Sequence, residues 1–120
     1  MPERMNVRNR RFLNELPPVF KALSDPTRLR LLNLLAEGEV CVCHLGEVLH
    51  MVQPTVSRHL AYLKKAGLVT TRREGKWMHY GWRKQADPVT RSILEGVRDW
   101  MMKDPALRQE RRALKGVCCP

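Results

Sequence analysis

Two pairs of cysteines are the residues of this chain best suited to chemistry. Cys41 and Cys43 stand one residue apart in the stretch EGEVCVCHLGEVL, residues 37–49, and Cys118 and Cys119 are neighbours near the C-terminus. Thiolates are soft ligands, which suit soft metals and metalloids far better than hard cations. Thiols also oxidise reversibly, and a buried cysteine can pack as a small apolar side chain. Residue type therefore leaves ligand binding, redox sensing and packing open for Cys41 and Cys43.

The spacing of Cys41 and Cys43 conflicts with the helix that the surrounding residues predict. The apolar positions of this stretch favour a short helix over about 41–49. Residues two apart on an ideal helix point about 200° away from each other. Two sulfurs bound to one atom, each at about 2.3 Å, must lie within about 4.6 Å of each other. We therefore expect chelation to distort the first turn of this helix.

The chain carries a strong positive charge that is concentrated in one segment. Its 120 residues include 22 Lys and Arg against 12 Asp and Glu, a net charge of +10. Residues 54–84 hold eight of the basic side chains and a single acidic one, Glu74. Such a segment is typical of a phosphate-binding surface, although a solvated basic face fits the charge equally well. No apolar run approaches the roughly 18 residues of a membrane span, and no secretory signal is recognisable, so we expect a cytoplasmic protein without membrane contact.

The predicted elements follow the order of a winged helix-turn-helix. Apolar spacing and capping residues predict four helices, over about 13–23, 26–37, 41–49 and 53–66. Pro17 and Pro18 are expected to break or restart the first helix. About three residues join the third and fourth helices, as in a helix-turn-helix. Strand-forming residues around REGK predict a β-hairpin over 68–83, and Asp87-Pro88 opens a last helix.

These elements predict one domain of a mainly α fold with a small β-hairpin (α+β). We expect a basic N-terminal extension over residues 1–11 and the winged helix-turn-helix domain over 12–104. Residues 105–120 are polar and basic, and we expect them to form a mobile tail that carries Cys118 and Cys119.

One face of the fourth predicted helix carries side chains that can read DNA bases. At about 100° per residue, its apolar side chains form one narrow stripe for packing. Thr55, Arg58, His59 and Tyr62 group on another face, about a quarter-turn away. Major-groove recognition needs such a polar face, with a guanidinium available for guanine. The further DNA contacts that we expect, from the ends of this helix and from the hairpin, are Gln53, Ser57, Arg72, Arg73 and Lys76.

The same residues resemble a known family. ALSDPTRLRLL, QPTVSRHLAYLKKAGLV and REGKWMHY are together similar to the ArsR/SmtB metalloregulatory repressors, over about residues 16–84. The resemblance implies a homodimer, which we expect to form through the first and last helices. It also implies binding to double-stranded operator DNA, with an inverted repeat, and release of that DNA when metal or metalloid binds.

The resemblance also suggests the effector. In this family, CVC followed by an acidic residue and leucine is the arsenite and antimonite box, and Cys41-Val42-Cys43 matches it, with His44 in the acidic place. The resemblance thus implies As(III), Sb(III) or a methylated As(III) as effector, with no obligatory cofactor. A third family cysteine is replaced by Gly46, so Cys118 or Cys119 is our hypothesis for a third sulfur. Residues 88–104 contain no histidine, so the family's zinc site is not expected.

The sequence also fits other functions. A repressor that senses oxidants through the same two cysteines is the alternative to a metalloid sensor, and a constitutive DNA-architectural protein is a further one. An enzyme is not expected, because the chain has no C-x-x-C, no phosphate-binding glycine loop and no alternating α/β pattern.

Overall fold

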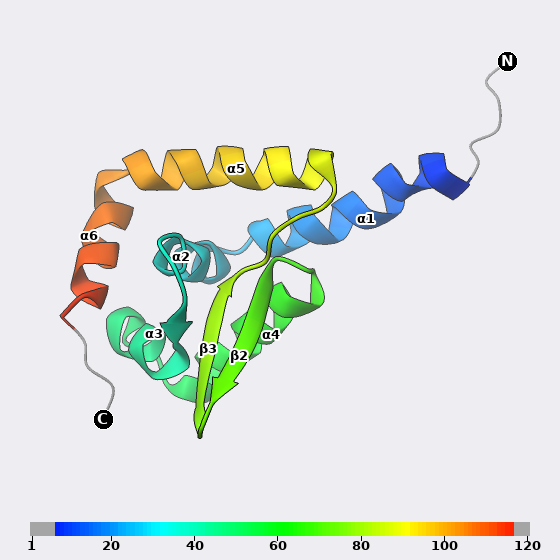
Figure 1. Ribbon diagram of the computed structural model, residues 1–120. Helices are drawn as coiled ribbons and strands as arrows, with labels where there is room; N and C mark the ends of the chain where they lie inside the picture. Colours follow the sequence, from blue (N-terminus) through cyan, green and yellow to red (C-terminus); the bar gives the residue numbers. More distant parts are fainter. Residues whose placement is uncertain (1–6, 117–120) are drawn as a thin grey trace, which may run out of the picture.

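The computed structural model describes residues 7–116, with side chains from residue 12 onward. Six helices and three strands are present in this part of the chain (Figure 1). They are α1 (Val7–Leu23), α2 (Pro26–Leu34), β1 (Val40–Cys41), α3 (Val42–Leu49), α4 (Gln53–Lys65), β2 (Val69–Glu74), β3 (Trp77–Trp82), α5 (Pro88–Lys103) and α6 (Pro105–Leu114). The predicted winged helix-turn-helix is confirmed.

The helix-turn-helix is held by a tight connection between α3 and α4. His50 ends α3 in the left-handed region, with φ 55°, and the Met51 amide donates to the Gly46 carbonyl at 3.0 Å. Pro54 lies in the first turn of α4, where a missing N–H costs nothing. The predicted apolar stripe of α4 is buried and packs in the core, at Val56, Leu60 and Leu63.

The wing is a three-stranded sheet rather than a lone hairpin. The strand order is β1-β3-β2, and both pairs are antiparallel. Neighbouring pairs place Val40 opposite Tyr80 and Cys41 opposite His79. The third strand was not predicted, because two residues are too few to show an alternating pattern. It places Cys41 in the sheet, beside the middle strand of the wing.

The first helix runs through its two prolines without a break, so the prediction that Pro17 and Pro18 interrupt it is wrong. The carbonyl partners that the prolines leave unpaired belong to Leu13 and Asn14, which are exposed on the surface where water can reach them. The apolar spacing of α1 is only partly used by the core. Leu16 is buried, whereas Leu13 and Phe20 keep 60% and 52% of their surface exposed.

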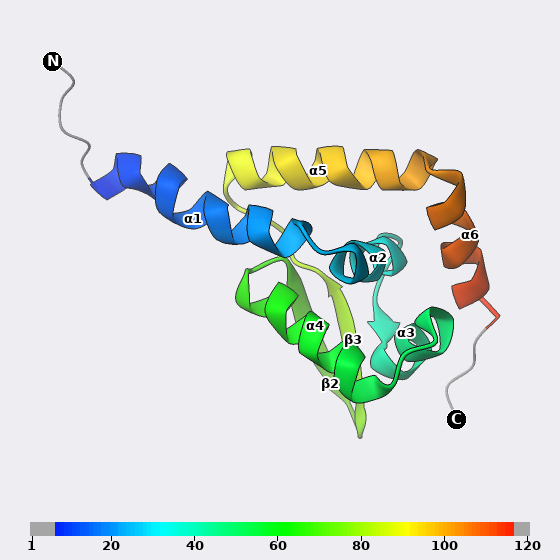
Figure 2. The ribbon, with the colours of Figure 1, turned by 180° about the vertical axis from the view of Figure 1, so that it is seen from behind.

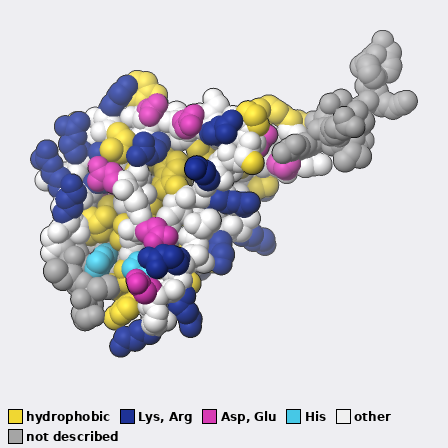
Figure 3. Space-filling view, in the orientation of Figure 1, with side chains coloured by type: hydrophobic (Ala, Val, Ile, Leu, Met, Phe, Trp, Pro, Cys, Tyr) yellow, Lys and Arg dark blue, Asp and Glu magenta, His cyan; other side chains and the backbone are white. Residues whose placement is uncertain are grey.

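Helix α5 has a similar exposed apolar side. Leu94 and Met101 are buried against the core, whereas Val89 and Trp100 are exposed. Figures 1 and 2 show α5 lying along the edge of the molecule from which α1 projects. Hydrophobic side chains gather where the start of α5 meets α1 (Figure 3). No helix in the described part of the chain has the length and apolarity to cross a membrane.

The segment after Pro105 is a helix, so the predicted mobile tail is wrong for residues 105–114. Asp104 caps α6 by accepting from the Leu107 amide. Buried polar groups then fix α6 to α2: Arg111 donates to the Asn33 side chain, and Asn33 donates to the Leu107 carbonyl at 3.0 Å. Residues 105–114 have a polar sequence because the contacts that order this helix are made by polar side chains. Cys118 and Cys119 lie outside the described residues.

Candidate functional site

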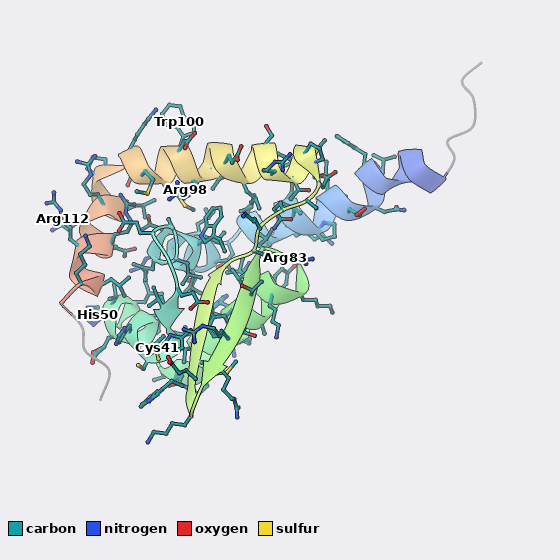
Figure 4. The ribbon with its side chains drawn as sticks, in the orientation of Figure 1. Cys41, His50, Arg83, Arg98, Trp100 and Arg112 are labelled. Carbon is teal, nitrogen blue, oxygen red and sulfur yellow. The ribbon has the colours of Figure 1, made fainter. Side chains whose placement is uncertain are left out.

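The two central cysteines lie close together at the junction of β1 and α3. Figure 4 labels Cys41 at this junction. Cys41 is buried and extended, with φ −70° and ψ 141°, and Cys43 is the second residue of α3. Their Sγ atoms are 3.2 Å apart. The predicted conflict with helix geometry is therefore wrong, because Cys41 lies outside the helix and the 200° separation does not apply. The two sulfurs therefore lie close together while α3 keeps its helical conformation.

The neighbouring residues of α3 do not complete a three-ligand site. His44 Nε2 is buried and forms no hydrogen bond with any residue that the structure describes. The residues that the structure describes contain no group of three or more His, Cys, Asp or Glu side chains placed to hold a metal ion. The described site thus offers two sulfurs, and any third sulfur must come from beyond residue 116.

Gly46, where the family often has its third cysteine, has a structural role of its own. A Cβ atom built there would lie 2.9 Å from the Met51 carbonyl oxygen, in the connection to α4. A side chain at this position therefore pushes apart the two helices of the helix-turn-helix.

We expect Gly46→Ala to lower the free energy of unfolding by about 1–3 kcal/mol, the usual cost of overpacking. Gly96→Ala is the matched control, because Gly96 is also helical but nothing lies within 4 Å of its added Cβ. That change should be neutral or stabilising by up to about 1 kcal/mol. Urea unfolding followed by circular dichroism measures both. Equal effects of the two substitutions would contradict this role of Gly46.

The structure divides the predicted base-reading residues of α4 into two groups. Arg58 is exposed, and Thr55 is half-buried near the start of the helix. His59 and Tyr62 instead face the start of α2: His59 Nδ1 lies 3.8 Å from Asp25 Oδ2, and the Arg28 guanidinium lies 4.0 Å from the Tyr62 ring centroid. Arg58 is thus the cation of this face most available to a base edge.

Asp25 gives His59 a neighbour that helical periodicity alone did not predict. Its carboxylate caps α2 by accepting from the Arg28 amide at 3.0 Å, and this hydrogen bond lowers the pKa of Asp25. The carboxylate is therefore charged and attracts His59 from the neighbouring helix. Capping residues were part of the prediction of this helix, but the contact of Asp25 with α4 depends on how the two helices pack.

The wing carries the other predicted DNA contacts. Arg72 Nε donates to Glu39 Oε1 at 2.9 Å, and this bond lowers the pKa of Glu39 and raises that of Arg72. Arg73 and Lys76 are exposed and form no ion pair with any described residue; Lys76 lies 5.3 Å from the Trp77 ring centroid. Lys and Arg side chains extend along the hairpin to its tip (Figure 3). Glu39 is a site residue that sequence reasoning missed, because its partner is 33 positions away.

Helix α4 and the wing are joined as one surface. Lys64 near the end of α4 donates to the Thr71 hydroxyl of β2 at 3.3 Å. Gln53 is exposed at the first position of α4, and Ser57 is half-buried one turn later. The predicted contacts of α4 and of the hairpin therefore belong to adjoining elements.

Comparison with known proteins gives consistent results. Residues 25–71 match the family model described as "Bacterial regulatory protein, arsR family". The chain is 44% identical over 97 residues to the "Arsenic resistance transcriptional regulator ArsR1" of Pseudomonas putida, covering 77% of this chain and 75% of that protein. It is 40% identical over 115 residues to ArsR2 of the same organism, covering 86% and 96%.

Solved structures agree in fold. A homodimeric winged helix-turn-helix DNA-binding domain from Mycobacterium bovis, a possible ArsR-family transcriptional regulator, superposes with a TM-score of 0.66 at 31% identity. The match covers 82% of this chain and 92% of that one. HlyU from Vibrio cholerae gives a TM-score of 0.65 at 26% identity, covering 80% and 97%.

Proposed function

The chain belongs to the ArsR family of bacterial regulatory proteins, and on that premise we propose that it represses an arsenic-resistance operon and releases the operator when trivalent arsenic or antimony binds. It is a DNA-binding transcriptional regulator and not an enzyme. Its relatives in Pseudomonas putida and Escherichia coli are named as regulators of arsenic or arsenical resistance. A repressor acts where the chromosome is, so we assign it to the cytoplasm.

The observation that carries the proposed effector site is the 3.2 Å separation between the sulfurs of Cys41 and Cys43. Two sulfurs bound to one atom must lie within about 4.6 Å of each other, and these two do. Cys43 takes part in a disulfide in this structure, so it must be reduced before it can bind a metalloid. Soft sulfur ligands favour As(III) or Sb(III), including methylated As(III), over hard cations. No additional cofactor is required.

The tail cysteines are our candidates for a third sulfur. Helix α6 contacts both α2 and α3, which brings the C-terminal end of the described chain to the side of the molecule that carries α3 (Figures 1 and 2). Cys118 is two residues beyond Gly116, a reach of at most about 7 Å in extended chain.

We expect the double variant Cys118→Ser/Cys119→Ser to bind As(III) about tenfold more weakly, because one sulfur–arsenic bond is lost. Its affinity for DNA without metalloid should not change. Isothermal titration calorimetry measures the first quantity, and fluorescence anisotropy the second. Unchanged affinity and stoichiometry for As(III) would remove the tail from the site.

The DNA-binding surface that we propose combines α4 with the wing. Arg58 and Thr55 are assigned to base edges, with His59 and Tyr62 beside them. Phosphate contacts are assigned to Gln53, Ser57, Arg72, Arg73 and Lys76. A two-fold symmetric dimer would present two such surfaces, which suits an inverted repeat.

We propose that the chain forms a homodimer through the exposed apolar sides of α1 and α5. The exposed large apolar side chains of these helices are Phe12, Leu13, Phe20, Val89 and Trp100. Exposed apolar patches of this kind mark interaction sites. The similar structure from Mycobacterium bovis is described as homodimeric.

We expect Leu13→Asp to raise the dimer dissociation constant at least about tenfold, because a carboxylate would be buried without a partner. Leu13 is 60% exposed in the single chain, so the subunit itself should still fold. Asn14→Asp adds the same charge one position away and serves as the control. Sedimentation velocity at several concentrations distinguishes the two variants, and a Leu13→Asp protein that dimerises like the wild type would exclude α1 from the interface.

The proposed function is tested by titrating the protein–DNA complex with arsenite. The probe is a fluorescein-labelled duplex of the DNA upstream of the chain's own gene, and a phosphine reductant keeps the thiols reduced. Release by arsenite under these conditions supports the proposal. The close sulfurs would also suit a redox-sensing repressor. Such a protein should stay bound to the DNA when arsenite is added and should dissociate only when an oxidant is added. Measurable turnover of arsenate by the pure protein would contradict both.

A further inference from the structure

One face of the three-stranded sheet connects Cys41 with the wing. Cys41 of β1 lies opposite His79 of β3, and His79 lies opposite Arg72 of β2. Residues opposite one another in antiparallel strands project on the same face, and residues two apart along a strand do so as well. Glu39, two residues before Cys41, therefore belongs to this face. Acidic, basic and histidine side chains gather on it (Figure 3).

Glu39 reaches Arg72 by crossing the middle strand at a glycine. A Cβ atom built on Gly81 would lie 3.1 Å from Cγ of Glu39, closer than an ordinary contact. Glycine in a strand interior often marks such a close approach of another chain segment. Because Gly81 has no side chain, Oε1 of Glu39 lies 2.9 Å from both Nε and Nη2 of Arg72. The ion pair thus extends from the β1 segment to β2, across β3.

The rest of the Arg72 guanidinium also faces a carboxylate. Its Nη1 atom lies 3.7 Å from Oε1 of Glu74, and the same oxygen lies 3.4 Å from Nε2 of His79. Arg73 and Lys76 on the same hairpin form no ion pair with any residue that the structure describes. The charge of Arg72 is therefore neutralised by carboxylates, whereas Arg73 and Lys76 remain available to phosphate.

We propose that Glu39 competes with DNA phosphate for Arg72, and that the thiol site controls this competition. The inference rests on the proposed function. Metalloid bound to both Cys41 and Cys43 fixes β1 to the start of α3, which keeps Glu39 in place over Gly81. Arg72 then stays paired and the wing lacks one phosphate contact. Without metalloid, the short β1 segment can shift and phosphate displaces Glu39. Glu39 is thus a positioning residue for the release of DNA.

The test uses Glu39→Gln, which keeps the side-chain shape and removes its charge. We expect it to tighten binding of the duplex about twofold without arsenite and about fivefold with saturating arsenite, the range of an exposed ion pair. Arsenite would therefore weaken DNA binding by a smaller factor than in the wild type. With arsenite, the slope of log affinity against log salt should steepen by about one, because one more phosphate is neutralised.

Two controls separate this competition from a general effect of charge. Glu37→Gln removes the same charge from an exposed residue that pairs with no described side chain, and we expect a smaller change from it. In an Arg72→Gln background, Glu39→Gln should change the affinity no more than Glu37→Gln does. Equal effects of Glu37→Gln and Glu39→Gln, or a full effect without Arg72, would overturn the inference.

The inference and the proposed function fail differently. If arsenite releases wild type and Glu39→Gln to the same extent and their affinities without arsenite agree, Glu39 has no role and the metalloid mechanism stands. If arsenite does not release the wild type, the proposed function fails. The affinities without arsenite then still decide whether Glu39 competes with DNA for Arg72.

Discussion

Serine in place of either Cys41 or Cys43 is expected to abolish the release of DNA by arsenite. Either substitution removes the bond by which As(III) would join β1 to α3, even if a tail cysteine still binds it, so the coupling between metalloid and DNA binding is lost. Coupling free energies of about 1–3 kcal/mol correspond to five- to 150-fold changes in affinity, and we expect this whole factor to disappear. The affinity for DNA without metalloid should stay within about twofold of wild type, because serine is close to cysteine in shape.

Fluorescence anisotropy of the labelled duplex, with and without arsenite, measures both affinities for each variant. Thermal unfolding shows whether the fold is kept, which matters because Cys41 is buried. The double tail variant is an informative comparison: it should retain part of the release, whereas Cys41→Ser and Cys43→Ser should retain none. Undiminished release from both single variants would exclude this thiol pair as the effector site.

Replacing Arg58 with alanine is expected to have the largest effect on DNA recognition. A bidentate contact between arginine and guanine contributes about 1–3 kcal/mol of discrimination, so affinity for the operator should fall about five- to 150-fold. Affinity for a duplex of unrelated sequence should fall much less, because only the phosphate contacts remain. The ratio of the two affinities is therefore the quantity to measure.

Arg73→Ala provides the contrast to Arg58→Ala. Arg73 is exposed on the wing and is assigned to phosphate, so its loss should weaken both duplexes by similar factors. It should also reduce the salt slope by about one. If Arg58→Ala behaves in the same way, with no change in the specificity ratio, Arg58 contacts phosphate and the assignment to a base is wrong.

Apolar periodicity, together with the prolines and turn residues that mark the ends of elements, predicted most of the fold. The helix-turn-helix followed from apolar spacing and from Pro54, and the hairpin followed from strand-forming residues around one short turn. Local sequence was less informative where long-range contacts decide the structure. The order of α6 depends on the buried pairing of Arg111 with Asn33, 78 positions away, and β1 exists because β3 offers it an edge.

In the candidate site, too, residue types were predictable from local sequence, whereas features that depend on long-range contacts were not. The soft-ligand chemistry of Cys41 and Cys43 was evident from residue type, and the exposure of Arg58 agrees with the helical periodicity. Their geometry was not evident, since the extended conformation of Cys41 comes from strand pairing and brings the sulfurs together. Glu39 was missed because a carboxylate in a loop gives no local signal of a partner across the sheet.

The length of β1 has a consequence for how the molecule fluctuates. Two residues attach this strand to β3, whereas β2 and β3 are paired along six residues each. Elements with few backbone hydrogen bonds open locally at a small fraction of the global unfolding free energy. Amide protons of residues 37–41 should therefore exchange with solvent deuterium well before those of α4. A ligand that joins Cys41 to Cys43 would slow this exchange, so hydrogen exchange can detect occupancy of the thiols without any DNA present.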